Sequence, residues 1–273
     1  MIELTWRLIE AGHCIHPEAS TRTGASMARC EFPALVALLR HPARGWILFD
    51  TGYGEAFMQA TRRMPEALYR CVTPVRLSAQ QSAVAQLHRL GIKAGDIGTV
   101  VLSHLHGDHV GGLADFGDSK VWCSHEAWQD MHGRSRLAAL ARGLLPDLVP
   151  LRLQDRLTYI ESAPLVRLPA ELAPFAAGHD LFGDGSLLAV ALPGHAAGHF
   201  GVCFRNSRQW VFLVADAAWS AQAITDNVPP PGWATALLGD TRLYRATLAD
   251  LHRLAACRSG VLLVPAHCRS FRP

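Results

Sequence analysis

A chain of 273 residues, 49% of them hydrophobic, can bury a substantial core, and its net charge of +3 leaves it close to neutral. Its arginines form no dense run that could follow a phosphate backbone, and no stretch reaches the ~18 apolar residues of a membrane span, so we expect neither nucleic acid nor a membrane as a partner. The N-terminus lacks a signal-peptide pattern, and seven cysteines without a C-x-x-C pair argue against a disulfide framework and favour a cytoplasmic protein.

Strand-like and helix-like segments alternate along the chain. In chain order, strands are predicted over residues 4–8, 33–39, 46–49, 99–102, 121–123, 187–192, 201–204, 210–214 and 261–264. Ser78 and Gln81 have the spacing of a capping box, which predicts a helix from there to Gly91. Residues 125–144 are predicted to be mainly helical, and residues 243–256 to form an amphipathic helix. The alternation indicates a mixed α/β protein with sheets covered by helices.

A dense group of metal-binding side chains directly follows the predicted strand 99–102. The segment 103–109 reads S-H-L-H-G-D-H, and its candidate ligands are His104, His106, Asp108 and His109. Loops at strand ends are common positions for catalytic groups. Imidazole nitrogen and carboxylate oxygen suit zinc, iron, manganese or cobalt, whereas the lack of cysteine in this segment argues against a closed structural zinc site.

Three more ligand-type residues each come just after a predicted buried strand. They are His195, Asp216 and His267. A single loop cannot complete a site for two metals, so further ligands must come from other strand ends. We therefore expect these three side chains to lie beside the segment 103–109.

The H-x-H-x-D-H run at 104–109 resembles the metallo-β-lactamase superfamily. The later His195, Asp216 and His267 and the upstream Asp50-Thr51-Gly52 support the resemblance, which extends over nearly the whole chain. It implies a single domain over residues 1–273. It also implies a four-layer αβ/βα sandwich, with two mixed sheets flanked by helices, two similar halves and the active site at the sheet edges.

The same resemblance implies two divalent metal ions, with zinc expected and manganese, iron or cobalt as alternatives. One ion would be held by His104, His106 and His195. The second would be held by Asp108, His109 and His267, and Asp216 would bridge the two. Asp50 would orient a ligand imidazole, and His199 is expected to support the site without binding metal.

The stretch from Ala215 to Ser220 is similar to N-acyl homoserine lactonases, in which a tyrosine commonly follows the bridging aspartate by three residues. This chain has Trp219 at that position, and an indole cannot reproduce the hydrogen bonding of a phenol. We expect Trp219 to line the substrate pocket. Other residues available to line it are Met27, Phe32, Trp122, Trp128 and Trp233.

These features favour hydrolysis of an ester-like carbonyl in a small molecule, most simply a lactone such as an N-acyl homoserine lactone. In this hypothesis a metal-bound hydroxide attacks the carbonyl, and Asp108 passes a proton to the leaving alkoxide. The corresponding biological role would be quorum quenching. A thioesterase or phosphodiesterase on the same scaffold remains an alternative, and a non-catalytic small-molecule binder is a weaker one. A homodimer is left open.

Overall fold

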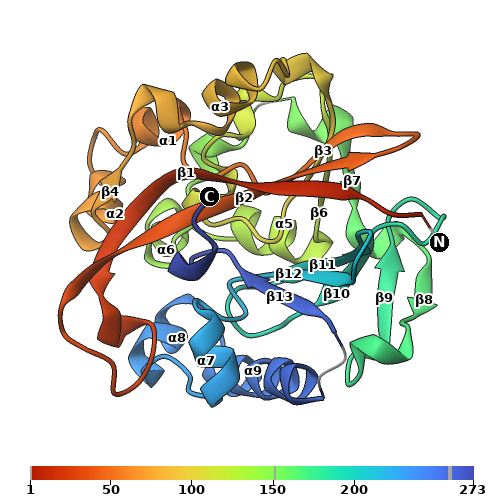
Figure 1. Cartoon of the computed structure of the whole chain (residues 1–273). Helices are drawn as coiled ribbons and strands as arrows, with labels where there is room; N and C mark the ends of the chain where they lie inside the picture. The colour runs from red at the N-terminus through yellow and green to blue at the C-terminus, as the bar shows by residue number, and fades with distance from the viewer. Residues whose placement is uncertain (1, 151, 258–259) are drawn as a thin grey trace.

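The computed structural model describes residues 2–150, 152–257 and 260–273, and its strands form two mixed sheets (Figure 1). The first sheet contains β1 (Thr5–Pro17), β2 (Arg29–His41), β3 (Gly45–Phe49), β4 (Val75–Arg76), β5 (Ile97–Val101), β6 (Lys120–Cys123) and β7 (Leu157–Tyr159). The second contains β8 (Leu165–Arg167), β9 (Ala177–Asp180), β10 (Leu188–Ala191), β11 (Phe200–Arg205), β12 (Trp210–Ala215) and β13 (Leu262–Pro265). Their strand orders are β4-β1-β2-β3-β5-β6-β7 and β13-β12-β11-β10-β9-β8.

Helices cover the outer faces of both sheets. They are α1 (Glu55–Ala60), α2 (Ala67–Val72), α3 (Ala83–Arg89), α4 (Gly107–Val110), α5 (His125–His132), α6 (Arg136–Ala141), α7 (Ala221–Asp226), α8 (Gly232–Leu238) and α9 (Thr241–Ala256). In Figure 1, α7, α8 and α9 lie below the second sheet, whereas α1 and α3 lie on the opposite side of the molecule. The expected four-layer sandwich with two mixed sheets is therefore confirmed.

Successive side chains along a strand point to opposite faces of the sheet, so each strand contributes to two different apolar cores. In β2, Val36 joins the core beneath the helices of the first sheet, whereas its neighbour Ala37 joins the core between the sheets. In β12, Leu213 likewise faces the other sheet, whereas Phe212 packs in the core that contains Leu248 of α9. Both faces of each sheet are thus buried, which explains why these strands read as continuous apolar runs.

The helix predicted to begin at Ser78 begins later. Ser78 and Gln81 do form a reciprocal capping box, but it closes a short 3₁₀ turn over Ala79–Gln81. Ser82 has an extended backbone, with φ −57° and ψ 149°, and its hydroxyl accepts a hydrogen bond from the N–H of Ala85. Ser82 is therefore the N-cap of α3, because its extended backbone ends the turn and lets a new helix begin.

The range 125–144 is mainly helical, as predicted, and it contains two helices, α5 and α6, with a break that was not predicted from the sequence. Gly133 ends α5, and the Ser135 hydroxyl accepts a hydrogen bond from the N–H of Ala138 to cap α6. A capping serine so soon after a helix-ending glycine favours a new start over a continuous helix. The break lets α6 place Leu137 and Leu140 on the wall of a large cavity.

Several strands end at one edge of the sandwich and carry the candidate site. Asp50 follows β3, the segment 103–109 follows the parallel neighbour β5, and Asp216 and His267 follow the parallel pair β12 and β13. Asp50 and Ala215, which precedes Asp216, both have left-handed backbones, with φ 63° and 47°. Such strain in non-glycine residues is typical of functional sites, where the surrounding structure enforces it.

The composition led to two expectations, one about membrane-spanning helices and one about disulfide bonds. None of the helices within the described ranges has the length and apolar character needed to cross a bilayer. The seven cysteines are all free thiols, and four of them are buried.

Candidate metal centre

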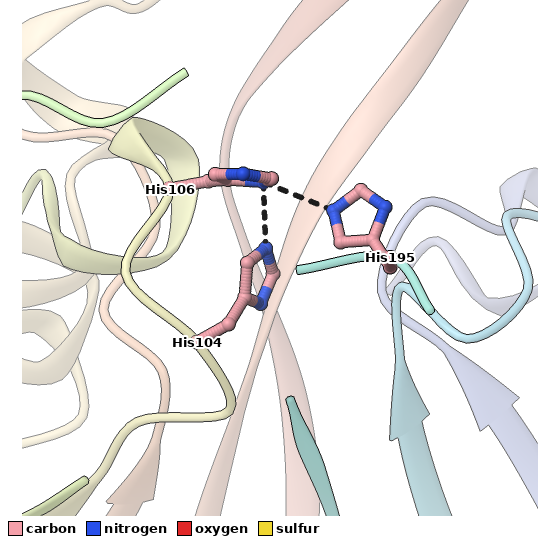
Figure 2. Close-up of side chains that lie close together, drawn as sticks. All are labelled: His104, His106 and His195. Carbon is pink, nitrogen blue, oxygen red and sulfur yellow. Dashed lines mark hydrogen bonds between the residues drawn. The ribbon is translucent and has the colours of Figure 1, made fainter. Parts of the chain in front are cut away.

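Three imidazoles from both halves of the sandwich converge at the first donor group, which consists of His104, His106 and His195. Nδ1 of His106 lies 2.9 Å from Nε2 of His104 and 2.9 Å from Nε2 of His195 (Figure 2). All three rings are buried. Three ring nitrogens directed at one point form a donor set that suits a divalent transition metal.

The second donor group lies beside the first and consists of Asp108, His109, Asp216 and His267. Nε2 of His267 lies 3.2 Å from Oδ2 of Asp108 and 3.2 Å from Oδ1 of Asp216. Nε2 of His109 lies 3.3 Å from the same Oδ1 atom. The ligand atoms of each group all lie within 4.8 Å of one another, which is close enough to share one ion.

Asp216 lies between the two donor groups. Its Oδ2 atom is 3.2 Å from Nε2 of His195, and its Oδ1 atom is 3.3 Å from Nε2 of His109. The structure therefore brings all seven residues expected as ligands to one location, and Asp216 occupies the position expected of a bridge between two ions.

The buried polar atoms of this cluster test whether it fits metal ions. Within the described residues, Nε2 of His109 and Oδ1 of Asp216 are buried without a hydrogen-bond partner. An unpaired buried polar atom is costly, and such atoms in a native protein call for a partner such as an ion. Since the donors are imidazole nitrogens and carboxylate oxygens, the residues fit two divalent cations.

Asp50 and Ser103 orient two histidines of the cluster through contacts with their Nδ1 atoms. Oδ2 of Asp50 accepts a hydrogen bond from Nδ1 of His109 at 2.8 Å, which leaves Nε2 of that ring facing the second donor group. Asp50 also accepts from the backbone N–H and the hydroxyl of Ser103, at 2.8 and 2.9 Å. The Ser103 hydroxyl lies 2.9 Å from Nδ1 of His104. Sequence reasoning assigned no role to Ser103, although its place at the start of the ligand segment is a signal.

His199 and the backbone support the cluster without joining either donor group. Nε2 of His199 accepts a hydrogen bond from the backbone N–H of Asp216 at 3.2 Å, and so helps to fix the backbone at this carboxylate. Nδ1 of His267 donates to the carbonyl oxygen of Pro33 in β2 at 2.8 Å, which leaves its Nε2 free for the second group.

Burial sets the charge of the imidazoles in the first donor group. It lowers the pKa of His106 to about 4 and holds the pKa of His104 and of His195 well below the ordinary value. These rings are therefore neutral near pH 7, which is the form that binds a metal.

In the second donor group the charged forms are favoured over the neutral ones, because two carboxylates face two imidazoles. Burial alone would raise the pKa of Asp108, but the neighbouring His109 and His267 outweigh it and lower the pKa to about 2. Burial alone would lower the pKa of His267, yet Asp216 and Asp108 hold it well above the ordinary value. Both carboxylates are therefore ionised near pH 7 and available as anionic ligands.

The two donor groups lie at the floor of a cavity of about 470 Å³. Apolar wall residues come from β2, α2, α6, α8 and the loop after β12, and they are Phe32, Leu68, Val72, Leu137, Leu140, Trp219, Trp233 and Leu237. The expected wall positions of Phe32, Trp219 and Trp233 agree with this lining. Met27, Trp122 and Trp128 do not line it, because Met27 is exposed and both indoles pack against the apolar cores.

The strand β1 also contributes to this cavity. Cys14 and His16 alternate along β1 and both face the cavity, whereas His13 lies near Glu10 and Glu31. Burial raises the pKa of the Cys14 thiol to about 12, so this sulfur stays protonated and neutral. Cys14 belongs to neither donor group, and its neutral thiol forms part of the apolar wall.

The sequence has recognisable relatives among known proteins. Residues 31–256 match the profile of the metallo-β-lactamase superfamily. N-acyl homoserine lactonase AiiB of Agrobacterium fabrum is 30% identical over 218 residues, which cover 80% of this chain and 73% of the relative. A probable metallo-hydrolase of Mycobacterium tuberculosis is 29% identical over 180 residues, which cover 63% of this chain and 53% of that protein.

Solved structures show the same architecture. An N-acyl homoserine lactone hydrolase with the product N-hexanoyl-L-homoserine at its catalytic metal centre superposes with a TM-score of 0.73 at 18% identity, covering 99% of this chain and 95% of the other. A dizinc quorum-quenching lactonase superposes with a TM-score of 0.65 at 16% identity, covering 98% and 89%. On the evidence of its sequence profile, its fold and its converging donors, the chain belongs to the metallo-β-lactamase superfamily.

Proposed function

We propose that this protein is a dinuclear metal-dependent hydrolase that opens the ring of an N-acyl homoserine lactone or a closely related ester. The observation that carries the proposal is the pair of donor groups around Asp216 at the floor of an apolar cavity of about 470 Å³. Charged donors at the floor suit a polar carbonyl group, and carbon-rich walls suit an acyl chain. The lactonase relative at 30% identity supports the same substrate class.

In this proposal the seven donor residues are divided between two ions. His104, His106 and His195 would hold one ion, Asp108, His109 and His267 would hold the second, and Asp216 would contribute to both. Two divalent ions supply a water of lowered pKa and an electrophilic centre for the carbonyl oxygen. Zinc suits the donors, and manganese, iron or cobalt would also fit them.

The protein side chains position the reactants and move the proton. Asp108 lines the cavity with its ionised carboxylate, so it can accept a proton from water and deliver it to the leaving alkoxide. Asp50 keeps His109 in the tautomer that faces the site. The apolar walls limit the water that reaches the reacting carbonyl, apart from the water at the donors.

We further propose that residues 1–273 act as one domain in the cytoplasm. Support for one domain comes from the core between the sheets, which includes Ile47 of the first sheet and Val211 of the second. Support for the cytoplasm comes from the seven free thiols, since a reducing compartment preserves them. A role in removing a diffusible acyl-lactone signal follows from the proposed substrate.

The test is mass-spectrometric detection of water addition to an N-acyl homoserine lactone. The protein should be freed of metal and then loaded separately with zinc, manganese or cobalt. We expect rapid ring opening that a chelator abolishes. Absence of ring opening from a fully loaded protein would contradict the lactonase proposal, and a panel of thioesters and phosphodiesters would then test the other hydrolase activities.

A further inference from the structure

Trp219 follows Asp216 by three residues, and its indole has a definite partner. Its Nε1–H donates a hydrogen bond to Oδ2 of Asp216 at 3.0 Å. The indole packs edge-on against the ring of His195, with centroids 5.8 Å apart and an interplanar angle of 84°. On another side it packs against the buried ring of Tyr244, with centroids 6.4 Å apart. The direction of the N–H is therefore fixed by contacts.

The chemistry of the donors around Asp216 makes this hydrogen bond different from its neighbours. Nε2 of His195 and Nε2 of His267 both lie 3.2 Å from Oδ2 of Asp216. An imidazole nitrogen that binds a metal has no hydrogen left to donate. The indole nitrogen keeps its hydrogen and is a donor only. Of these three contacts, the one from Trp219 is the contact that persists when ions are bound.

We propose that Trp219 is a positioning residue for Asp216, which holds the carboxylate in the orientation that presents Oδ2 to His195 in the first donor group and Oδ1 to His109 in the second. The inference rests on the proposed dinuclear function. Rotation of the carboxylate would move Oδ1 away from Nε2 of His109, which lies 3.3 Å from it, and the bridge would be lost. Because its one N–H is directed at Asp216, the indole has no further hydrogen to donate to a substrate.

Metal binding without any substrate provides the main test. Metal-free wild type, Trp219→Phe and Trp219→Tyr should each be titrated with zinc in competition with a chromophoric chelator. Trp219→Phe keeps an aromatic ring against His195 but removes the donor. We expect it to bind one of the two ions about 10-fold or more weakly, in line with other residues that hydrogen-bond metal ligands. Trp219→Tyr returns a donor at the ring edge and should recover part of that loss.

A spectroscopic comparison separates positioning from simple packing. We expect the cobalt-loaded Trp219→Phe protein to show altered d–d absorption bands, because the geometry at one ion changes. Trp233→Phe is the matched control, since Trp233 lines the same cavity and, within the described residues, its indole is not a hydrogen-bond partner of Asp216. It should keep the zinc affinities and the cobalt spectrum of the wild type.

Steady-state kinetics add a second criterion. A positioning role predicts a lower kcat with little change in KM, whereas a role as pocket wall alone predicts a higher KM with kcat unchanged. The inference is overturned if Trp219→Phe binds two ions with wild-type affinity and an unchanged cobalt spectrum. That result would leave the proposed hydrolase intact, whereas a wild type that does not bind two ions would contradict both proposals.

Discussion

Asp108 belongs to the second donor group and also lines the cavity, so its carboxylate can touch both an ion and a substrate. Its lowered pKa of about 2 keeps it ionised near pH 7. A carboxylate in this position is a base for a water proton as well as a ligand. The two roles can be separated by comparing proteins of equal metal content.

Replacing Asp108 by asparagine should remove the proton-accepting group with little change in shape. We expect kcat to fall by about 100-fold or more, which is the usual contribution of a positioned general acid or base. Initial rates should be measured on wild type and Asp108→Asn after both are shown to hold the same amount of metal. Near-normal rates from the fully loaded variant would exclude the proton-transfer role.

At the scale of single residues, the metal-binding side chains could be predicted from the sequence better than the residues that position them. Each predicted ligand follows a strand that is visible as an apolar run, so strand ends alone bring His104 and His267 to the same edge. The contacts of Ser103 and Trp219 depend on side-chain orientation in the folded protein. No pattern in the sequence specifies that an indole will point at Asp216, and for that reason Trp219 was expected only as a pocket wall.

Among the structural elements, the loop between β10 and β11 is packed closely against α9. Gly194, next to His195, has φ +125°, and a Cβ atom placed on it would lie 2.1 Å from the backbone nitrogen of Tyr244 at the start of α9. The backbone of the ligand loop therefore lies directly against the helix. Only glycine permits both this conformation and this approach.

The substitution Gly194→Ala should therefore destabilise the protein strongly. We expect its free energy of unfolding to fall by more than about 3 kcal/mol, through strain and backbone displacement together. Gly183→Ala is the matched control, because Gly183 also has a left-handed backbone, at φ +72°, but a Cβ atom placed on it would have no neighbour within 4 Å. The control should lose about 1–2 kcal/mol. Urea unfolding of the two variants measures the difference, and equal losses would show that contact with α9 is unimportant.

An ion pair links two helical segments that line the mouth of the cavity. Arg136 of α6 donates two hydrogen bonds to the carboxylate of Glu66, which precedes α2, at 2.5 and 2.6 Å. These bonds lower the pKa of Glu66 below its usual value of 4.5. The carboxylate is buried, whereas the guanidinium is largely exposed, so we expect a modest contribution to stability.

The pH dependence of this ion pair follows from the sign of the shift. Because the folded pKa of Glu66 is lowered, its stabilisation is present above pH 4.5 and is lost as the pH falls through the folded pKa. We expect Glu66→Gln to lower the Tm by a few degrees at pH 7 and to match the wild type well below pH 4. Thermal unfolding across this pH range is the measurement, and a difference that persists at low pH would contradict the ionic origin.

The elements themselves were predicted unevenly, for a physical reason. Strand β12 was found because both of its faces are buried and its sequence is continuously apolar, and β5 and β13 were found from shorter apolar runs that pack in the same cores. The start of α3 was placed wrongly, since two capping serines compete there. The break between α5 and α6 was not predicted, although a glycine interrupts the helical pattern at that point. Those choices depend on packing against the sheet, which local sequence does not describe.

At the scale of the whole molecule, the donors come from both sheets. His104, His106, Asp108 and His109 follow β5 of the first sheet, whereas His195, Asp216 and His267 follow strands of the second. Ions held between them would connect the two halves of the sandwich. Metal binding should therefore contribute to the stability of the fold as well as to activity.

Removal of metal should lower the thermal stability of the protein. A ligand present at about 100 times its Kd adds about 2.7 kcal/mol for each site, so we expect chelation to reduce the Tm by about 5 °C or more. Calorimetry before and after treatment with a chelator measures this change. Zinc should restore the Tm, whereas magnesium, which prefers oxygen ligands, should not. An unchanged Tm in a protein proven to be free of metal would contradict a role of the ions in joining the halves.

The apolar mouth of the cavity has a practical consequence for work in solution. Val72, Leu137 and Trp233 are 67%, 64% and 67% exposed there, on three different helices. Water solvates such a surface poorly, and surface-active molecules will adsorb to it. We expect mild detergents to act as competitive inhibitors in rate measurements, with a potency that follows the length of the alkyl tail rather than the chemistry of the head group. Rates measured in detergent would then reflect competition between the detergent and the substrate for the apolar mouth of the cavity.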